Sequence, residues 1–161
     1  MAKAKKSKSR KAKKQADAIE LLKRDHADVK KAFKAFEKAK YKDPQAGKDF
    51  VASICRDIEV HAALEEEIFY PAVRARIKDD DLMNEAQVEH NSAKQLIAEI
   101  QKLSGDDPML KAHAQVLAEY IQHHVREEEG EIFPKAKRAK LDLEALAQQM
   151  LERKEQLKAQ G

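Results

Sequence analysis

Four histidines and two glutamates occupy positions of an apolar repeat at which a helix would direct its side chains toward a core. They are His26, His61, Glu65, His90, His124 and Glu128. Other positions of the same repeat hold mainly Ile, Leu, Val and Phe. Burying a lone carboxylate costs several kcal/mol even after the protein relaxes. Two such glutamates therefore require a compensating positive charge, and a divalent or trivalent metal ion supplies one.

The spacing of these residues also indicates a metal site. His61–Glu65 and His124–Glu128 are His-x-x-x-Glu pairs, which lie one helical turn apart on one face. Imidazole and carboxylate together suit iron, manganese or zinc, and a ligand set without thiolates argues against copper(I) and iron–sulfur centres. Helical bundles build dinuclear sites from single ligands on two helices and ligand pairs on the other two. Because the single ligands here would be His26 and His90, the predicted site is rich in nitrogen.

Four long amphipathic segments must position these side chains. Apolar stripes with three- and four-residue spacing, typical of helices, cover residues 19–36, 51–72, 83–100 and 110–128. Asp-Pro at 43–44 and at 107–108 predicts an N-cap followed by the first helical residue, and the acidic run 79–81 predicts a third cap. Pro71 and Pro134 are predicted to kink or end the second and fourth helices.

Helices of this length with short connections predict an all-α fold, an antiparallel four-helix bundle over residues 17–140. Residues 141–161 predict an extra C-terminal helix packed on the bundle. With only four Gly and four Pro in 161 residues, there is little room for hairpins. Apolar runs of membrane-spanning length are absent from the sequence, as is an apolar core for a secretory signal. The single cysteine, Cys55, fits a reducing compartment, and we expect a cytoplasmic protein.

Residues 1–16 differ in charge from the rest of the chain. They hold eight Lys or Arg and no acid, whereas residues 17–161 have a net charge of −5. Since this segment has no large apolar residue beyond Met1, we predict a disordered basic tail. It is able to contact nucleic acid or acidic surfaces, although a solubilising or spacer segment is the preferred interpretation.

The two halves of the chain resemble each other. HAALEEEIFYP at 61–71 corresponds to HVREEEGEIFP at 124–134, and RDH at 24–26 corresponds to VEH at 88–90. A duplicated helix pair would give the bundle a pseudo-twofold axis.

With these motifs the chain resembles the hemerythrin-like family, which has the HHE cation-binding domain, over roughly residues 17–158. The resemblance implies a non-haem centre of two iron ions with an oxo or hydroxo bridge. It also implies that Glu65 and Glu128 bridge the ions, which are bound by one histidine pair each: His26 with His61, and His90 with His124. Family roles include reversible oxygen carriage, oxygen or iron sensing, and responses to nitric oxide or peroxide.

One departure from the family's oxygen carriers bears on the chemistry. Those proteins have a second histidine one turn away on the third helix, but here Ala86 and Lys94 lie four residues before and after His90. Both ions would be under-coordinated by protein, so water, peroxide or another side chain must complete them. The sequence therefore favours reaction with an external ligand over simple carriage.

Neighbouring residues have predicted supporting roles. Tyr120 and Asp57, one turn before His124 and His61, are candidates to accept the outer N–H of those histidines. His123 and His113 fall outside the stripe. The acids predicted to be solvated are Glu66, Glu67, Glu127 and Glu129. The side chains predicted to line a cavity are Phe33, Ile58, Ile97 and Ile121, and Cys55 is predicted to be a small buried filler.

The leading functional hypothesis is a di-iron protein that binds or reacts with oxygen, peroxide or nitric oxide; whether it is an enzyme is left open. An iron-buffering protein is one alternative. The other is a helical interaction module with a structural metal and a nucleic-acid-binding tail.

Overall fold

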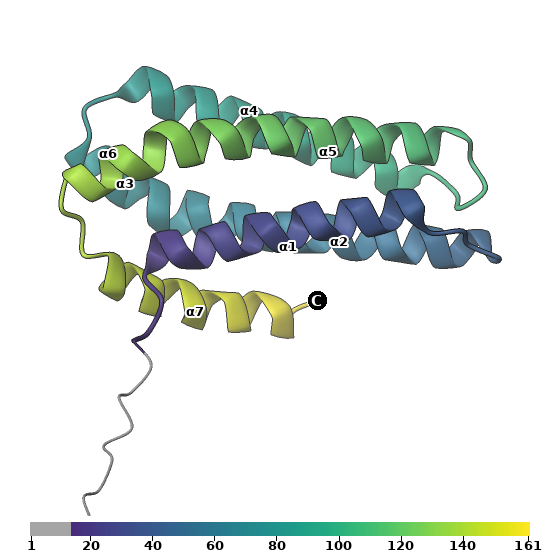
Figure 1. The fold of residues 1–161 in the computed structure, drawn as a ribbon, viewed down its shortest axis with the longest axis horizontal. Helices are drawn as coiled ribbons and strands as arrows, with labels where there is room; N and C mark the ends of the chain where they lie inside the picture. The colour runs from purple at the N-terminus through teal and green to yellow at the C-terminus, as the bar shows by residue number, and fades with distance from the viewer. Residues whose placement is uncertain (1–13) are drawn as a thin grey trace, which may run out of the picture.

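The computed structural model describes residues 14–161, and their regular structure is entirely helical (Figure 1). In chain order the helices are α1 (Ala18–Lys38), α2 (Pro44–Leu64), η1 (Glu65–Phe69), α3 (Tyr70–Arg76), α4 (Asp80–Lys102), α5 (Met109–Glu127), η2 (Glu128–Ile132), α6 (Phe133–Arg138) and α7 (Leu143–Ala159). Most of the predicted basic tail, residues 1–13, lies outside the described residues. Across residues 14–161, no helix is both long and apolar enough to cross a membrane.

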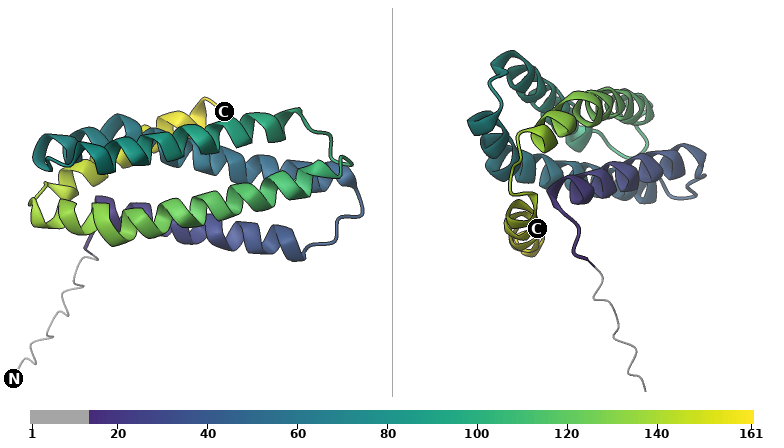
Figure 2. Two further views of the ribbon diagram at one scale, coloured as in Figure 1. Left: turned by 90° about the horizontal axis from the view of Figure 1, so that it is seen from above. Right: turned by 60° about the vertical axis from the view of Figure 1, so that its left-hand side comes forward.

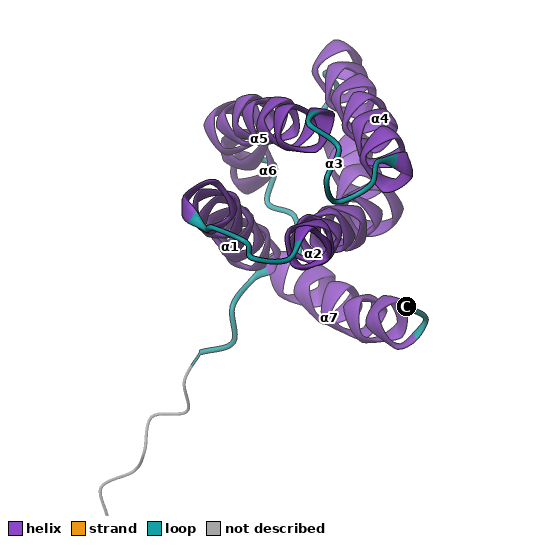
Figure 3. Ribbon diagram, turned by 90° about the vertical axis from the view of Figure 1, so that its right-hand side faces the viewer, coloured by secondary structure: helices purple, strands orange, loops and turns teal. Residues whose placement is uncertain are grey.

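The predicted antiparallel bundle is confirmed. Its four long helices, α1, α2, α4 and α5, surround a common core and each contacts two neighbours (Figure 3). The side views in Figure 2 show them running lengthwise past one another. The last helix, α7, lies outside this ring and packs against α1 and α2. It contributes the buried Ala147 and Met150 to the core at that end.

Aspartates begin the helices where the sequence predicts caps. Asp43 accepts the backbone N–H of Gln45 at 3.0 Å, and Asp79 accepts that of Leu82 at 3.3 Å. Before α5, Asp107 accepts the N–H of Met109 at 2.8 Å, and the helix begins one residue later than the Asp-Pro signal predicts. These bonds satisfy N–H groups that have no partner inside the helix.

A wide π turn interrupts the helical pattern before each predicted proline break. The N–H of Tyr70 bonds to the carbonyl of Glu65, and the N–H of Phe133 bonds to that of Glu128. Helical backbone then continues through the prolines into α3 and α6, so the chain does not leave the helix there. The N–H that each proline lacks falls where the hydrogen-bond register has already changed. Both turns begin at a predicted bridging glutamate.

Two apolar clusters fill the bundle, one on each side of the polar residues. Along α1, Leu22 belongs to one cluster and Val29 to the other, with His26 between them. Along α4, Ala86 and Ala93 flank His90 in the same way. The predicted ligands therefore lie in the middle of the core, insulated from solvent at both ends.

Candidate metal centre

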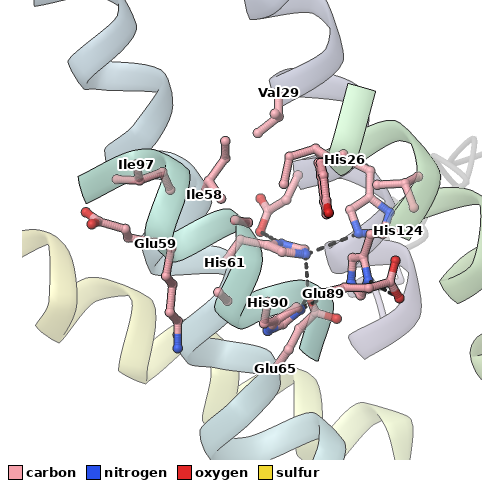
Figure 4. Close-up of a pocket in the computed structure, with 17 residues that line it drawn as sticks. His26, Val29, Ile58, Glu59, His61, Glu65, Glu89, His90, Ile97 and His124 are labelled. Carbon is pink, nitrogen blue, oxygen red and sulfur yellow. Dashed lines mark hydrogen bonds and ion pairs between the residues drawn. The ribbon is translucent and has the colours of Figure 1, made fainter. Parts of the chain in front are cut away.

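The six residues singled out in the sequence converge in the bundle core. Glu65 and Glu128 are fully buried, and His26, His90 and His124 nearly so. They form two overlapping groups of potential metal donors, each with its donor atoms within 4.8 Å of one another. One group has His26 and His61, the other has His90 and His124, and both include the two glutamates. The arrangement offers two adjacent places where a cation could bind, with the carboxylates shared between them. Figure 4 shows the four histidines and Glu65 gathered around the adjoining pocket.

The ring nitrogens within each group are spaced like neighbouring ligands of one ion. The Nε2 atoms of His26 and His61 are 3.1 Å apart, and those of His90 and His124 are also 3.1 Å apart. Two nitrogens about 2.1 Å from one ion, at right angles to each other, would be about 3.0 Å apart. Glu128 lies between the pairs, with Oε1 3.2 Å from His26 Nε2 and Oε2 3.3 Å from His124 Nε2.

Unsatisfied oxygens provide the test of whether this chain fits a metal. Both oxygens of Glu65 and Oε1 of Glu128 are buried without a hydrogen-bond partner. His61 Nε2 approaches Glu65 Oε1 at 2.6 Å, a close charge contact rather than a well-directed hydrogen bond. Native proteins rarely leave such groups unpaired unless an ion or water completes them. The donor set therefore fits a pair of cations.

The pKa values of the metal-free site also indicate that its buried carboxylates need positive charge. Burial and the charge of Glu128 raise the pKa of Glu65 to about 7. Burial alone would lower the pKa of His61, but Glu65, Asp25 and Glu128 raise it to about 10. Likewise, hydrogen bonds to Glu128 and Glu89 overcome burial and raise the pKa of His124 to about 11. Without a metal, the site takes up protons to balance its carboxylates.

Each of the four histidines has a carboxylate facing its outer nitrogen, Nδ1. Three of these contacts are hydrogen bonds: His26–Glu129 at 3.0 Å, His61–Asp25 at 3.1 Å and His124–Glu89 at 3.4 Å. The fourth, His90–Glu66 at 3.5 Å, is a charge contact that leaves His90 Nδ1 without a hydrogen bond. An outer carboxylate that accepts Nδ1–H fixes the tautomer and leaves Nε2 free for a metal. Every one of these acids is the sequence neighbour of a predicted ligand on a different helix.

This arrangement corrects several predictions about the supporting residues. Tyr120 and Asp57 are exposed and do not accept the outer N–H groups of His124 and His61. Glu66 and Glu129, predicted to be solvated, face His90 and His26 instead. Tyr120 and Asp57 lie on the same helix as the histidine that each was predicted to contact. The acids that do face the histidines come from other helices.

A buried phenol that the sequence analysis missed completes one side of the site. The Tyr70 hydroxyl donates a short hydrogen bond to Glu128 and lies 3.3 Å from the Nε2 atoms of both His90 and His124. Burial and the charges of Glu65 and Glu128 raise the pKa of Tyr70 well above its ordinary value. The available signal was the repeat itself, because Tyr70 corresponds to Phe133 in the second motif.

At the other pair of histidines, the ring of Phe133 takes the corresponding place. It stacks on His26 with a centroid separation of 5.9 Å and an interplanar angle of 5°. This ring offers no donor atom. The other side chain that the sequence analysis left open as a completing donor therefore has a candidate, the Tyr70 hydroxyl, which faces His90 and His124 but not His26 and His61.

A cavity of about 40 Å³ adjoins the histidines. Ile58, Ile97 and Ile121 line it as predicted, together with Val29 and Ala93, whereas Phe33 packs in the apolar core. This volume suffices for a ligand of one or a few atoms. The apolar lining offers such a ligand few competing polar partners.

The described fold and site agree with comparisons to known proteins. The family model for the hemerythrin HHE cation binding domain matches residues 17–136, and the chain belongs to this family. A solved hemerythrin HHE cation binding domain-containing protein from Mycobacterium kansasii shares the fold, with a TM-score of 0.77 and 21% identity over 91% of this chain and 90% of that one.

A relative from Nostoc sp., described as a DNA nickase, is 31% identical over 114 residues. The match covers 71% of this chain but 32% of the relative. The chain thus spans about a third of the length of that protein.

Proposed function

We propose that the chain is a cytoplasmic non-haem di-iron protein that binds or reacts with oxygen, peroxide or nitric oxide. The observation that carries the proposal is the pair of donor groups that share Glu65 and Glu128. His26 and His61 would hold one ion, and His90 and His124 the other, with the two glutamates and an oxo or hydroxo group between them. The nitrogen-rich, thiolate-free donor set supports iron.

Tyr70 makes the two proposed ion positions chemically different. Its hydroxyl faces His90 and His124, so this position would have a phenol oxygen as an additional donor. The position of His26 and His61 has Phe133 there instead, whose ring offers no donor atom, and so would leave a coordination place for an external ligand. The bound ions would supply Lewis acidity and redox equivalents. The chain's own contribution is to orient the imidazoles through their outer carboxylates and to exclude water with the apolar cavity.

Metal analysis tests the composition of the site. Protein loaded anaerobically with Fe²⁺ should retain about two ions per chain, the number that this type of bundle site holds. One tightly bound zinc ion, with no second metal under iron-replete anaerobic loading, would contradict the proposal. Retention of far more than two iron ions would instead support iron storage.

Rapid mixing separates reaction from carriage. The diferrous protein, mixed with oxygen in a stopped-flow instrument, should oxidise quickly, and the protein should consume added peroxide. Oxygen uptake that persists for many minutes and is reversed under vacuum would restore oxygen carriage as the function.

A second candidate function is DNA binding. It is favoured by the description of the Nostoc relative as a DNA nickase and by the eight basic residues of segment 1–16. Fluorescence anisotropy with a labelled duplex tests it. Binding should weaken steeply with salt and be lost when residues 1–16 are removed. Equal binding by the truncated protein would exclude the basic segment as the contact.

A further inference from the structure

We propose that the chain has a separate cation site at its surface, formed by Glu89 of α4 with His123 and Glu127 of α5. One donor atom from each residue lies within 4.8 Å of the other two. His123 Nε2 is 3.3 Å from Glu127 Oε1 and 3.7 Å from Glu89 Oε2. Neither His123 nor Glu127 belongs to the two central donor groups.

An orphaned oxygen points into this cluster. Glu89 Oε1 accepts the outer N–H of His124 at 3.4 Å, whereas Oε2 is buried without a hydrogen-bond partner. The Glu89 side chain is only 12% exposed. A buried acceptor left unpaired costs free energy comparable to a lost hydrogen bond. Oε2 therefore calls for a positive partner that the two neighbouring side chains could hold in place.

The corresponding carboxylate in the other half has such a partner. Asp25, which matches Glu89 in the repeat, bonds to the outer N–H of His61 through Oδ2 and accepts a 2.7 Å bond from Lys154 through Oδ1. Lys154 lies on α7, which packs against α1 and α2. The ammonium group thus occupies the place at Asp25 that corresponds to Glu89 Oε2.

The residues beside the two carboxylates differ in the matching way. His123 and Glu127 of the second motif correspond to Val60 and Leu64 of the first. Where the chain supplies its own cation, the neighbours are apolar. Beside Glu89, the neighbours are two metal-ligating side chains.

Charge and exposure define the ligand as a divalent transition-metal ion. Two carboxylates face the single imidazole of His123, so the three donors together carry a net negative charge whenever that ring is neutral. One imidazole and two carboxylates suit Zn²⁺ or Fe²⁺, and three protein ligands leave a coordination position for water. His123 is 54% exposed and Glu127 29%, so an ion can enter from solvent.

The shared carboxylate connects this site to the central one. An ion on Oε2 of Glu89 would draw electron density from the same group that accepts the N–H of His124. Occupancy of the surface site should therefore alter the environment of the His124 ring. The site itself requires only the three named residues, and it stands whether or not the central ions are iron.

Equilibrium dialysis of the full chain against Zn²⁺ tests the proposal, with His123→Gln and Glu127→Gln as variants. Each variant should bind one equivalent fewer than wild type at a Zn²⁺ concentration that saturates wild type. His113→Gln is the matched control, because His113 pairs with a single acid, Glu99, at 3.2 Å on the same pair of helices. It should bind as many equivalents as wild type.

Imidazole NMR provides an independent readout. Zn²⁺ added after the central positions are filled should shift the His123 ring resonances and, to a smaller extent, those of His124. Because His123 is exposed and Glu127 partly exposed, the melting temperatures of both variants should match wild type and exclude misfolding. Wild-type stoichiometry in both variants, or an equal loss in the His113→Gln control, would overturn the proposal.

Discussion

The two halves of the bundle repeat one ligand pattern but surround it differently. Each half supplies two histidines, one bridging glutamate candidate and a π turn that begins at that glutamate. They diverge where Tyr70 in one half corresponds to Phe133 in the other. They also diverge where Asp25 accepts a 2.7 Å bond from Lys154, whereas Glu89 Oε2 has only the imidazole of His123 at 3.7 Å. The repeat thus gives two groups of potential metal donors, and single side chains around them make the two groups unequal.

The largest effect should follow from removing what the halves share. Replacing both glutamates, Glu65→Leu with Glu128→Leu, should abolish paired-metal binding. It should also make the melting temperature independent of Fe²⁺, because the carboxylates shared by the two donor groups are lost. Metal analysis and thermal melts with and without anaerobic Fe²⁺ measure both effects.

In wild type, Fe²⁺ should raise the melting temperature, since it binds the native state preferentially. The control is Glu67→Gln with Glu131→Gln, two exposed acids from the same motifs. If Fe²⁺ left the melting temperature of the wild-type protein unchanged, metal binding would not stabilise the fold and this prediction would be refuted.

Exchanging the Tyr70 and Phe133 side chains tests the asymmetry of the two positions. Tyr70→Phe should remove any visible absorption from a phenol oxygen bound to iron and make the two positions more alike. Phe133→Tyr should add a phenol beside His26. Tyr41→Phe, in the distant apolar cluster, is the control. An unchanged iron spectrum in Tyr70→Phe would show that the hydroxyl only donates to Glu128.

A smaller effect on metal binding is expected from Lys154 of α7, which contacts the Asp25 carboxylate beside His61. Lys154→Met removes the cation from Asp25, whose pKa is held at about 2 by His61 and Lys154 despite the opposing effect of burial. Since Lys154 is partly exposed, the pair should contribute at most about 1 kcal/mol. Chelator competition should show weaker binding of one ion by less than about tenfold. Equal weakening of both ions would argue against an effect confined to the His61 side.

The smallest effect concerns Cys55, which corresponds to Ala118 in the other half; both are buried. Burial, with a smaller contribution from Glu59, raises the pKa of the thiol to about 12. Folded protein should therefore resist alkylation by iodoacetamide at pH 8. Because an unfolded chain loses this proton near pH 9, the thiol should reduce stability as pH rises from 9 toward 12.

Cys55→Ala makes the halves more alike at this position. It should lower the free energy of unfolding by about 1 kcal/mol and leave the iron content unchanged. Rapid alkylation of the native wild-type protein would contradict the burial of this thiol.

The sequence by itself determined the bundle and the convergence of the six residues. Helical periodicity assigns each side chain to a face, and His26 or Glu65 within an apolar stripe has nowhere to lie but the core. The duplicated motifs also showed which residues of the two halves occupy equivalent positions. These inferences need only the spacing of residues along single helices.

The tertiary structure alone decided which side chains meet between helices. Asp25 reaches His61, Glu89 reaches His124, and Tyr70 reaches the second histidine pair, because of the rotation and axial offset of neighbouring helices. The docking of α7 likewise brings Lys154 to Asp25 across 129 positions of sequence. Periodicity fixes the direction of a side chain around its own helix, but it does not fix the height at which another helix passes.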